Sequence, residues 1–490
     1  MWDRVADCGP MPTSGVLTRT KIVATVGPAS DAASTLRAMA AAGMDVARVP
    51  LAHGSVDDAV ARVRRIRDAV PGVGVMADLP GPKIRCAAFP DGGAQLVSGS
   101  RVVLVEACEG EGSSESRIGI CHPDLVAGLR YGDAVALGDG GVILAVGRRA
   151  DGGVEATVQS GGRVQGRPGV TAPSGRIPIV TPTVEDLGRL AAVVGEGIDA
   201  VAVSFVRSAA DIEAIRGAAG VDCPMLVAKI ETPEAVAELD GIVAVSDAVM
   251  VARGDLGVRM ALEDVPHIQK RIIRSAVRYG RPVITATQML ESMVYSPVPT
   301  RAEVADVANA VLDGTSAVML SAETAIGVDP VAVVATMARI ARRAELDFDF
   351  VGWGSGLAPQ AVVGDAFSSA RLTAATTAAG WRAALEEDAA CIVACTNSGA
   401  TARAISRFRP AMPIVACTPS ERTARQLTFS WGVHTITLGE ASSTDEIVWF
   451  AVQAVVQAGY AAAGDVVVVL AGSPTEPQPA TDTMRLVRVR

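Results

Sequence analysis

Three charged residues end or follow short apolar runs of the kind that form buried strands: Lys229, Glu231 and Asp255. Lys229 and Glu231 end the run that begins at Met225, and residues two apart on a strand point to the same side. A second apolar run, 248–252, is followed by Arg-Gly-Asp, whose acid is Asp255. Two carboxylates and an ammonium that converge at strand ends could hold Mg²⁺ and a phosphorylated or oxo-acid substrate. The alternative is an ordinary salt bridge between strand ends.

The elements that must position these residues form a repeated strand–helix pattern. A helical stretch, 233–239, separates the two apolar runs, and parallel strands covered on both faces are nearly all apolar. Eight such strands are predicted in all, three before residue 80 and five after residue 174. Eight units predict a closed (β/α)8 TIM barrel, in which the carboxy ends of the strands form the active site. An open, doubly wound sheet is the competing architecture.

Changes in periodicity divide the chain into further parts. Between residues 83 and 173 the pattern becomes short strands separated by glycine, which predicts a small inserted β-barrel domain, or lid. Beyond a linker at 349–360, strand and helix patterns return and predict a separate α/β sandwich. The expected limits are 1–17 for an N-terminal arm, 18–82 and 174–346 for the barrel, 83–173 for the lid and 358–490 for the C-terminal domain.

Composition limits the possible functions. The net charge of −9 and a pI near 5.2 argue against a nucleic-acid-binding protein, which needs a basic face. No apolar run approaches the length that spans a membrane, and the first residues lack the apolar core of a signal peptide. Several of the eight cysteines lie within apolar runs, as reduced, buried thiols do. We therefore expect a cytoplasmic protein that binds neither nucleic acid nor membrane.

Several stretches, in this order along the chain, resemble the pyruvate kinase family: TKIVATVGPAS, DLPGPKIR, VSFVR, VAKIETPE, VMVARGDLG, TATQMLESM and PTRAEVADVANAVLDGTSAVMLSAET. They extend over most of the chain, and the last is the longest and most specific. The resemblance implies a (β/α)8 barrel with a β domain inserted after its third strand and a C-terminal α/β domain. It also implies the last step of glycolysis, in which phosphoenolpyruvate and ADP give pyruvate and ATP, with Mg²⁺ or Mn²⁺ as cofactor.

The resemblance assigns catalytic roles to residues at the predicted strand ends. Glu231 and Asp255 match the family's ligands of the divalent ion. Lys229 matches the lysine that stabilises the transferred phosphoryl group, and Arg48 matches an arginine that contacts the same phosphate. Thr287 matches the threonine at the face where enolpyruvate is protonated. These roles suit phosphoryl transfer, which depends on positioning and on charge neutralisation.

Further contacts are implied for the substrate and the nucleotide. Gly254 and Asp255 match a helix start whose backbone N–H groups would hold the substrate carboxylate. His53 and Arg85 match nucleotide contacts between barrel and lid, and Asp139 matches an acid near the metal of the nucleotide. The alternatives are solvated loop residues for His53 and Arg85, and an aspartate of a glycine-rich turn for Asp139.

The chain departs from the family pattern at the site of a monovalent cation, usually K⁺. The Asn and Ser whose side chains supply oxygens to that ion are replaced by Pro50 and Ala52, which offer none. A glutamate of the family pattern is replaced by Lys83, whose ammonium could supply the positive charge that K⁺ otherwise brings. We therefore expect that K⁺ is not required. The alternative is that Lys83 only faces solvent beside the hinge.

A loop in the predicted C-terminal domain resembles the family's site for the phosphate of a regulatory ligand. Its hydroxyls, its glycine and the free N–H groups of a helix start would suit an anion, although a capped helix start has the same residues. The ligand would be a phosphorylated sugar or nucleotide effector. The expected contacts are Thr396, Asn397, Ser398, Gly399 and Thr401.

The resemblance also implies an allosteric homotetramer, and two other functions stay open. One is a diverged paralogue that acts on another enol phosphate. The altered cation positions would favour it, as would Pro168, which stands where the family often has a basic residue near the nucleotide. The other is a catalytically weak, effector-binding subunit. The presence of Lys229, Glu231, Asp255 and Thr287 argues against this second alternative.

Overall fold

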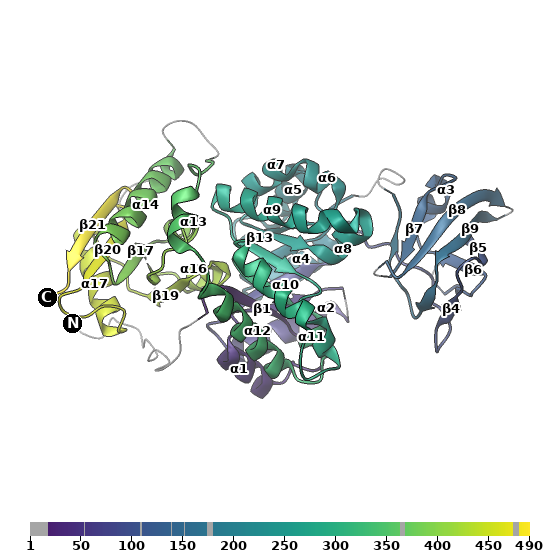
Figure 1. Cartoon of the computed structure of the whole chain (residues 1–490), viewed down its shortest axis with the longest axis horizontal. Coiled ribbons are helices and arrows are strands. Elements are labelled where there is room, and N and C mark those ends of the chain that lie inside the picture. Colours follow the sequence, from purple (N-terminus) through teal and green to yellow (C-terminus); the bar gives the residue numbers. More distant parts are fainter. Residues whose placement is uncertain are drawn as a thin grey trace.

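The computed structural model describes residues 18–52, 54–107, 110–138, 140–150, 152–173, 180–362, 368–473 and 480–490. Three bodies follow one another along the longest axis of the molecule (Figure 1). A closed barrel lies in the centre, the inserted β domain lies at one end, and the C-terminal α/β domain lies at the other. The fold class predicted from the sequence is therefore confirmed.

The central barrel consists of parallel strands hydrogen-bonded in the order β1-β16-β15-β14-β13-β12-β3-β2. Every residue of β1, β3 and β14 is buried, as expected for apolar strands that are covered on both faces. The insertion separates β3 from β12 in the sequence, yet the two strands are neighbours in the barrel. The strand bounds are β1 (Lys21–Thr25), β2 (Val46–Pro50), β3 (Gly74–Leu79), β12 (Ala200–Val203), β13 (Met225–Ile230), β14 (Ala248–Ala252), β15 (Val283–Ala286) and β16 (Ala317–Leu320).

Helices cover the outside of the barrel, and polar side chains cap the first turns of several of them. Ser55, Thr183 and Thr300 each form a capping box that satisfies free N–H groups of the first turn. The bounds are α1 (Ala33–Ala42), α2 (Val56–Ala69), α4 (Val184–Val194), α5 (Ala209–Ala219), α8 (Arg253–Arg259), α9 (Val265–Tyr279), α10 (Arg301–Leu312), α11 (Ala322–Ala325) and α12 (Pro330–Glu345), with 3-10 turns η1 (Leu262–Asp264) and η2 (Glu291–Val294).

The single helix expected at 233–239 is instead two helices, α6 (Pro233–Ala237) and α7 (Leu239–Val245). Glu238, with a ψ of 20°, lies outside helical geometry between them. The break allows Leu239, the first residue of α7, to be buried in the barrel core.

The inserted domain has its own apolar core and two sheets. The larger sheet has the order β11-β7-β8-β9-β5-β6, and bridges from Arg85 to Gly169 and from Cys86 to Ile120 connect its two edges. One short helix, α3 (Pro123–Gly128), interrupts the strands that the sequence predicts. The strand bounds are β4 (Ala94–Leu96), β5 (Arg101–Glu106), β6 (Arg117–Ile120), β7 (Ala134–Leu137), β8 (Val142–Ala150), β9 (Gly153–Ser160), β10 (Gly162–Val164) and β11 (Val170–Thr171).

The C-terminal domain is a five-stranded sheet with the order β19-β18-β17-β20-β21, in which only β21 is antiparallel to its neighbour. The strand bounds are β17 (Cys391–Cys395), β18 (Ile414–Thr418), β19 (Val433–Thr437), β20 (Val466–Ala471) and β21 (Thr483–Arg488). The helices are α14 (Ser369–Glu386), α15 (Ala400–Ser406), α16 (Glu421–Gln426) and α17 (Thr444–Gln457), with a 3-10 turn η3 (Leu427–Phe429).

The segment predicted as a linker before this domain contains a helix, α13 (Phe350–Gly356). Asp349 caps it by accepting a hydrogen bond from the Gly352 N–H at 2.8 Å. Trp353 of this helix donates its ring N–H to the carbonyl of Arg407 at 3.0 Å. Capping and this aromatic contact give the segment a fixed position that its glycine content does not predict.

Ion pairs join the barrel to the C-terminal domain. Asp199, fully buried at the start of β12, accepts a hydrogen bond from Arg425 Nε at 3.0 Å. The same carboxylate pairs with Arg67 of α2. Arg422 donates to the carbonyl of Cys223 at 2.8 Å. These contacts hold the two domains against each other.

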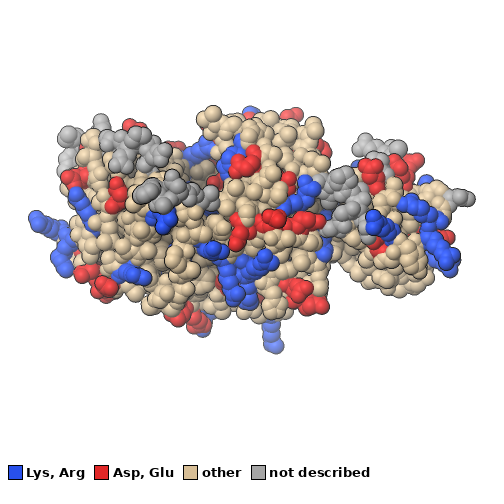
Figure 2. Space-filling view, turned by 90° about the horizontal axis from the view of Figure 1, so that it is seen from above, with Lys and Arg blue, Asp and Glu red and all other residues tan. Residues whose placement is uncertain are grey.

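The surface carries charges of both signs. Figure 2 shows basic and acidic side chains interspersed over one face of the molecule, without a continuous basic stripe. Over the described residues, we find no helix that combines the length and the apolar composition needed to cross a lipid bilayer.

Candidate active site

Charged side chains meet at the carboxy ends of β2, β3 and β13. Arg48 Nε lies 2.6 Å from Asp78 Oδ2, and Lys229 Nζ lies 3.4 Å from Asp78 Oδ1. The Lys229 ammonium also lies 3.6 Å from Glu231 Oε2 and donates to Ser204 Oγ at 2.6 Å. The barrel thus brings Arg48, Lys229 and Glu231 together, at the end where TIM barrels carry their active sites.

Asp78 holds the two cations of this cluster. Burial alone would raise the pKa of Asp78, but Arg48 and Lys229 outweigh it and lower that pKa below its usual value. Burial would likewise lower the pKa of Lys229, but the carboxylates of Asp78 and Glu231 raise it. Both groups are therefore charged at neutral pH, and the ammonium of Lys229 is fixed by its partners.

Glu231 is fully buried, and only one of its oxygens accepts a hydrogen bond from the residues that the structure describes. Its Oε1 accepts a hydrogen bond from the Phe205 N–H at 2.6 Å. Phe205 has a left-handed φ of 57°. Its Oε2 has no hydrogen-bond donor among the described residues, although Lys229 lies 3.6 Å away. Burial, with further repulsion from Asp255, raises the pKa of Glu231 to about 7 against the opposing effect of Lys229.

This arrangement fits a divalent cation. A buried carboxylate oxygen without a donor is a ready ligand for Mg²⁺ or Mn²⁺, and Asp255 lies near enough to perturb Glu231 electrostatically. Within the described part of the chain, no group of three or more His, Cys, Asp or Glu residues forms a complete metal site. The geometry suits an ion held by one or two carboxylates, with substrate and water as its other ligands.

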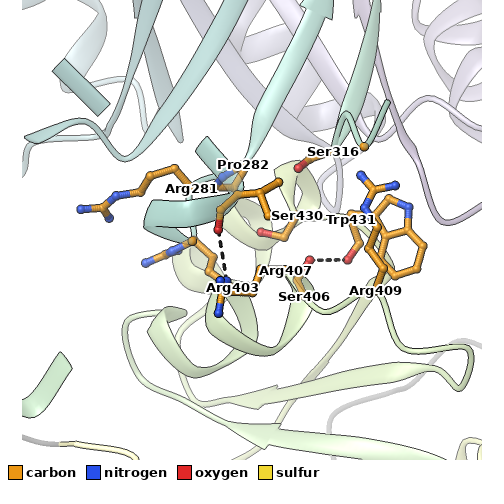
Figure 3. Close-up of a pocket in the computed structure, with 12 residues that line it drawn as sticks. Arg281, Pro282, Ser316, Arg403, Ser406, Arg407, Arg409, Ser430 and Trp431 are labelled. Atoms are coloured by element: carbon orange, nitrogen blue, oxygen red, sulfur yellow. Dashed lines mark hydrogen bonds between the residues drawn. The ribbon is translucent and has the colours of Figure 1, made fainter. Parts of the chain in front are cut away.

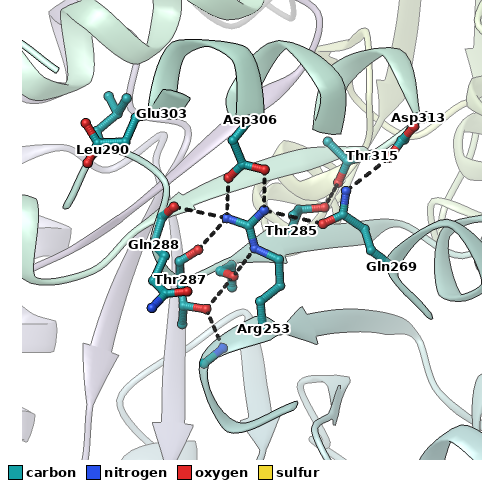
Figure 4. Close-up of polar contacts among 12 residues, drawn as sticks. Arg253, Gln269, Thr285, Thr287, Gln288, Leu290, Glu303, Asp306, Asp313 and Thr315 are labelled. Carbon is teal, nitrogen blue, oxygen red and sulfur yellow. Dashed lines mark hydrogen bonds and ion pairs between the residues drawn. The ribbon is translucent and has the colours of Figure 1, made fainter. Parts of the chain in front are cut away.

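A buried arginine fixes the backbone at the end of β15 (Figure 4). Arg253 donates to the carbonyls of Ala286 at 3.2 Å, Thr287 at 2.6 Å and Gln288 at 3.2 Å. Its guanidinium also pairs with Asp306 of α10 at 2.7 Å. Thr287 and Gln288 have left-handed φ values of 67° and 52°, which are costly for residues with side chains. Arg253 therefore stabilises a strained corner that carries Thr287.

The hydroxyl of Thr287 is held on both sides. It accepts a hydrogen bond from the Gly254 N–H at 2.8 Å and donates to the Ala286 carbonyl at 2.7 Å. Gly254 lies in the first turn of α8, so one N–H that the sequence assigns to the substrate is occupied by Thr287. The structure thus places Thr287 beside Gly254, and Asp255 follows Gly254 in the first turn of α8.

Lys83 and Arg85 lie at the connection to the inserted domain rather than in this cluster. Lys83 is exposed, and the end of its side chain lies beside Gly169. Arg85 donates to the carbonyl of Arg167 at 3.2 Å. Among the described residues, no hydrogen bond or ion pair links Lys83 or Arg85 to the cluster that contains Arg48. His53 and Asp139, the other predicted nucleotide contacts, lie outside the described residues.

The predicted effector loop connects β17 to α15 and lines a cavity of about 390 Å³ in the C-terminal domain. Thr396 Oγ1 accepts from the Gly399 N–H at 2.9 Å, and Gly399 has a left-handed φ of 82°. Thr401 is buried and its hydroxyl lies 2.6 Å from that of Thr481. Asn397 and Ser398 line the same cavity. Four of the five predicted residues therefore line one cavity, and Gly399 lies between them at the start of α15.

Three residues of the barrel site were not predicted from the sequence. Asp78 and Ser204 contact Lys229, and the N–H of Phe205 binds Glu231. Asp78 and Ser204 do follow apolar strand runs, which was the signal available. Phe205 contributes through its backbone N–H and its backbone conformation, and the type of its side chain does not predict either.

Comparison with known proteins agrees with this architecture. Residues 17–334 match the family described as "Pyruvate kinase, barrel domain", and residues 374–487 match "Pyruvate kinase, alpha/beta domain". A pyruvate kinase of Methylorubrum extorquens is 40% identical over 96% of this chain and 97% of its own length. Pyruvate kinases of Mycobacterium tuberculosis (39%) and Agrobacterium vitis (41%) each cover 96% of this chain and 98% of their own. The chain therefore belongs to the pyruvate kinase family and is a phosphotransferase.

Proposed function

We propose that the chain transfers the phosphoryl group of phosphoenolpyruvate to ADP and releases pyruvate and ATP. The observation that carries this proposal is the cluster in which Arg48 and Lys229 share Asp78, with Glu231 beside Lys229. Phosphoryl transfer needs fixed charges and positioning more than covalent chemistry, and this cluster supplies both. The name shared by the relatives, pyruvate kinase, supports the choice of substrates.

Arg48 and Lys229 would bind the phosphoryl group and stabilise its charge during transfer. Asp78 keeps both cations in place, and Ser204 fixes the direction of the Lys229 ammonium. Glu231 and Asp255 would hold Mg²⁺ or Mn²⁺, which when bound neutralises charge on the phosphoryl oxygens. The free oxygen of Glu231 supports this assignment.

Thr287 would act at the step in which the enolate carbon takes up a proton. Its hydroxyl is oriented by the Gly254 N–H and the Ala286 carbonyl, so a water bound to it would have a fixed position. The carboxylate of the substrate would lie near Gly254 and Asp255. It would then share the Gly254 N–H with Thr287 or displace the threonine from it.

The nucleotide would bind between the barrel and the inserted domain. Arg85 lies at that connection, and His53 and Asp139 are the other proposed contacts. Lys83 lies there as well, exposed and beside Gly169. We assign to its ammonium the charge that K⁺ supplies elsewhere in the family, so that activity would not require K⁺.

Regulation and assembly belong to the C-terminal domain in this proposal. The cavity lined by the 396–401 loop would bind a phosphorylated sugar or nucleotide effector. Strand β21 ends the sheet with Met484 and Leu486 exposed, which supports its use in a homotetramer. The enzyme would act in glycolysis, in the cytoplasm.

The decisive experiment is a coupled assay that follows pyruvate formation from phosphoenolpyruvate and ADP with Mg²⁺ or Mn²⁺. Activity that needs all three components supports the proposal, and its absence in the folded protein contradicts it. Replacing K⁺ by tetramethylammonium at equal ionic strength tests the role of Lys83. A tenfold or larger fall in kcat/KM for phosphoenolpyruvate without K⁺ would refute that role.

A further inference from the structure

A small cavity lies where the amino ends of the barrel strands meet the C-terminal domain (Figure 3). Its volume is about 20 Å³, measured as the space open to the centre of a water molecule. This is the end of the barrel opposite to the charged cluster, because the cavity adjoins Pro282 before β15 and Ser316 before β16. The lining that matters for its chemistry is Arg281, Arg403, Arg407, Arg409, Ser430 and Trp431.

The four arginines of this cavity donate to backbone carbonyls, and two of them also lie over aromatic rings. Arg407 lies 4.9 Å from the ring centre of Phe408, and Arg409 lies 4.9 Å from that of Trp431. No ion pair with a carboxylate is formed by any of them among the described residues. A carbonyl dipole satisfies an N–H group but does not offset a full charge. The bonds run from Arg281 to Ala244 at 3.0 Å, from Arg403 to Ser398 at 2.8 Å, from Arg407 to Val277 at 3.1 Å and to Ala358 at 2.7 Å, and from Arg409 to Thr315.

The acids that act on these arginines have other partners. Asp247 influences Arg281 and Arg403, but it lies 3.4 Å from Arg216. Glu345 influences Arg409, but its oxygens accept the backbone N–H groups of residues 19 and 20. Burial lowers the pKa of Arg403 to about 10 and that of Arg409 to about 9, so both remain charged at neutral pH. Arg407 and Arg409 are buried, and Arg281 and Arg403 are half-buried. Carbonyl dipoles and aromatic rings therefore offset the positive charge of this interface only in part.

The cavity is also short of hydrogen-bond acceptors. Ser430 is 1% exposed, and its hydroxyl has no hydrogen-bond partner among the described residues. The same holds for Arg281 Nε, Arg403 Nη1 and the ring nitrogen of Trp431. The three nitrogens can only donate, and a hydroxyl can donate too. Buried polar groups of this kind are normally satisfied, so an acceptor is expected here.

We propose that this cavity binds one small inorganic anion, which joins the barrel to the C-terminal domain. A water molecule could accept from one or two donors, but it would leave the buried charge uncompensated. The size of the cavity excludes a sugar phosphate or a nucleotide. The site is distinct from the larger cavity beside the 396–401 loop.

Arg403 connects the proposed anion to that loop. Its Nη1 has no hydrogen-bond partner among the described residues, and its Nη2 donates to the carbonyl of Ser398. Arg403 also lies against Gly399, where an added Cβ would approach Nη1 to 2.6 Å. An anion that fixes Arg403 would therefore also fix the position of Ser398 and Gly399.

Diffraction from crystals of the full chain, grown with sodium bromide or sodium selenate, locates such an anion directly. We expect an anomalous peak inside the cavity between Arg403 and Ser430. In solution, phosphate, sulfate or chloride should raise the thermal midpoint by roughly 2–4 °C in a saturable way, at ionic strength held constant with sodium gluconate. A cavity without an anomalous peak for either probe would overturn the proposal.

Two isosteric variants separate the need for charge from the filling of space. Ser430→Asp supplies a carboxylate within the cavity, and Ser430→Asn supplies the same shape without charge. In gluconate buffer we expect Ser430→Asp to unfold at the higher temperature and to lose its response to phosphate. An equal or lower midpoint than that of Ser430→Asn would contradict the proposal, because a buried carboxylate is costly unless cations need it. Arg403→Gln should lose the anion response, whereas the exposed control Arg343→Gln should keep it.

Discussion

At the scale of single residues, the barrel site depends on one ammonium. Lys229 has three partners, Asp78, Glu231 and Ser204, and Arg48 pairs with the same Asp78. Two carboxylates overcome the burial that would otherwise lower its pKa. A charge held in this way costs little reorganisation when a phosphoryl group arrives, which is the condition for efficient electrostatic catalysis.

Lys229→Met removes this charge and keeps most of the side-chain volume. We expect kcat to fall roughly 10²–10³-fold or more, since one preorganised contact to the transition state is lost. Steady-state kinetics with phosphoenolpyruvate and ADP measure the effect, and circular dichroism verifies folding. Lys270→Met, at a half-exposed ion pair with Asp313, is the matched control and should keep near-normal kcat. A folded Lys229→Met protein with normal turnover would remove Lys229 from the mechanism.

His434 gives a prediction about pH and stability. Burial, with lesser effects of Lys21 and Arg19, lowers the pKa of His434 from 6.5 to about 3. Between these values the unfolded chain binds a proton that the folded chain does not, so His434 makes stability fall as pH falls below about 6.5. The limit for one such group is about 1.4 kcal/mol per pH unit. Between pH 7 and pH 5, the free energy of unfolding measured in urea should depend less on pH in His434→Gln than in the unaltered protein. An equal dependence on pH in the two proteins would contradict the prediction.

At the scale of elements, strand ends and helix starts hold the reactive groups through the backbone. The corner at Thr287 and Gln288 has two left-handed residues, and the fork of Arg253 binds the carbonyls on both sides of it. Phe205 has the same kind of backbone, and its N–H binds Glu231. Backbone strain in this barrel thus lies next to the residues with proposed catalytic roles.

Arg253→Lys tests whether the fork holds the corner. Lysine keeps the charge but cannot bind three carbonyls and Asp306 together, so the corner should relax. We expect a loss of roughly 2–4 kcal/mol of stability, from buried hydrogen bonds that are not replaced, and a fall in kcat of about tenfold or more. The exposed pair of Arg278 and Asp240 provides the control Arg278→Lys, with little change in either quantity. A fully active, equally stable Arg253→Lys would show that the corner does not need the guanidinium.

At the scale of the whole molecule, three bodies in a row place the barrel between the inserted β domain and the C-terminal α/β domain (Figure 1). The C-terminal sheet ends in β21, an exposed edge that carries Met484 and Leu486. Exposed apolar edges pair with other chains unless they are covered. The proposed tetramer would cover this edge.

Leu486→Glu should therefore weaken assembly. Like charges from two edges would face each other, and light scattering coupled to size exclusion should report dimers or monomers in place of tetramers. Val97→Glu, at an exposed valine of the inserted domain, controls for an added charge and should leave the mass unchanged. A tetramer that persists in Leu486→Glu would place the interface elsewhere.

The sequence by itself determined the barrel and part of its site. Apolar runs recur at βα spacing, so eight parallel strands could be counted, and the two-residue period placed Lys229 and Glu231 on one side of β13. These signals are local, because each depends only on neighbours along the chain. The division of 233–239 into two helices, and the helix at 350–356, were not predicted because their ends depend on packing and capping.

Only the tertiary structure decided which distant groups meet. Asp78 and Lys229 are 151 residues apart and become neighbours because β3 and β13 belong to one closed barrel. The buried arginines between barrel and C-terminal domain come from two segments that have no common sequence signal. Local periodicity fixes the direction of a side chain relative to its own element. Closure of the barrel and docking of the domains decide which partners that side chain meets. Such long-range contacts produce no periodic pattern in the sequence.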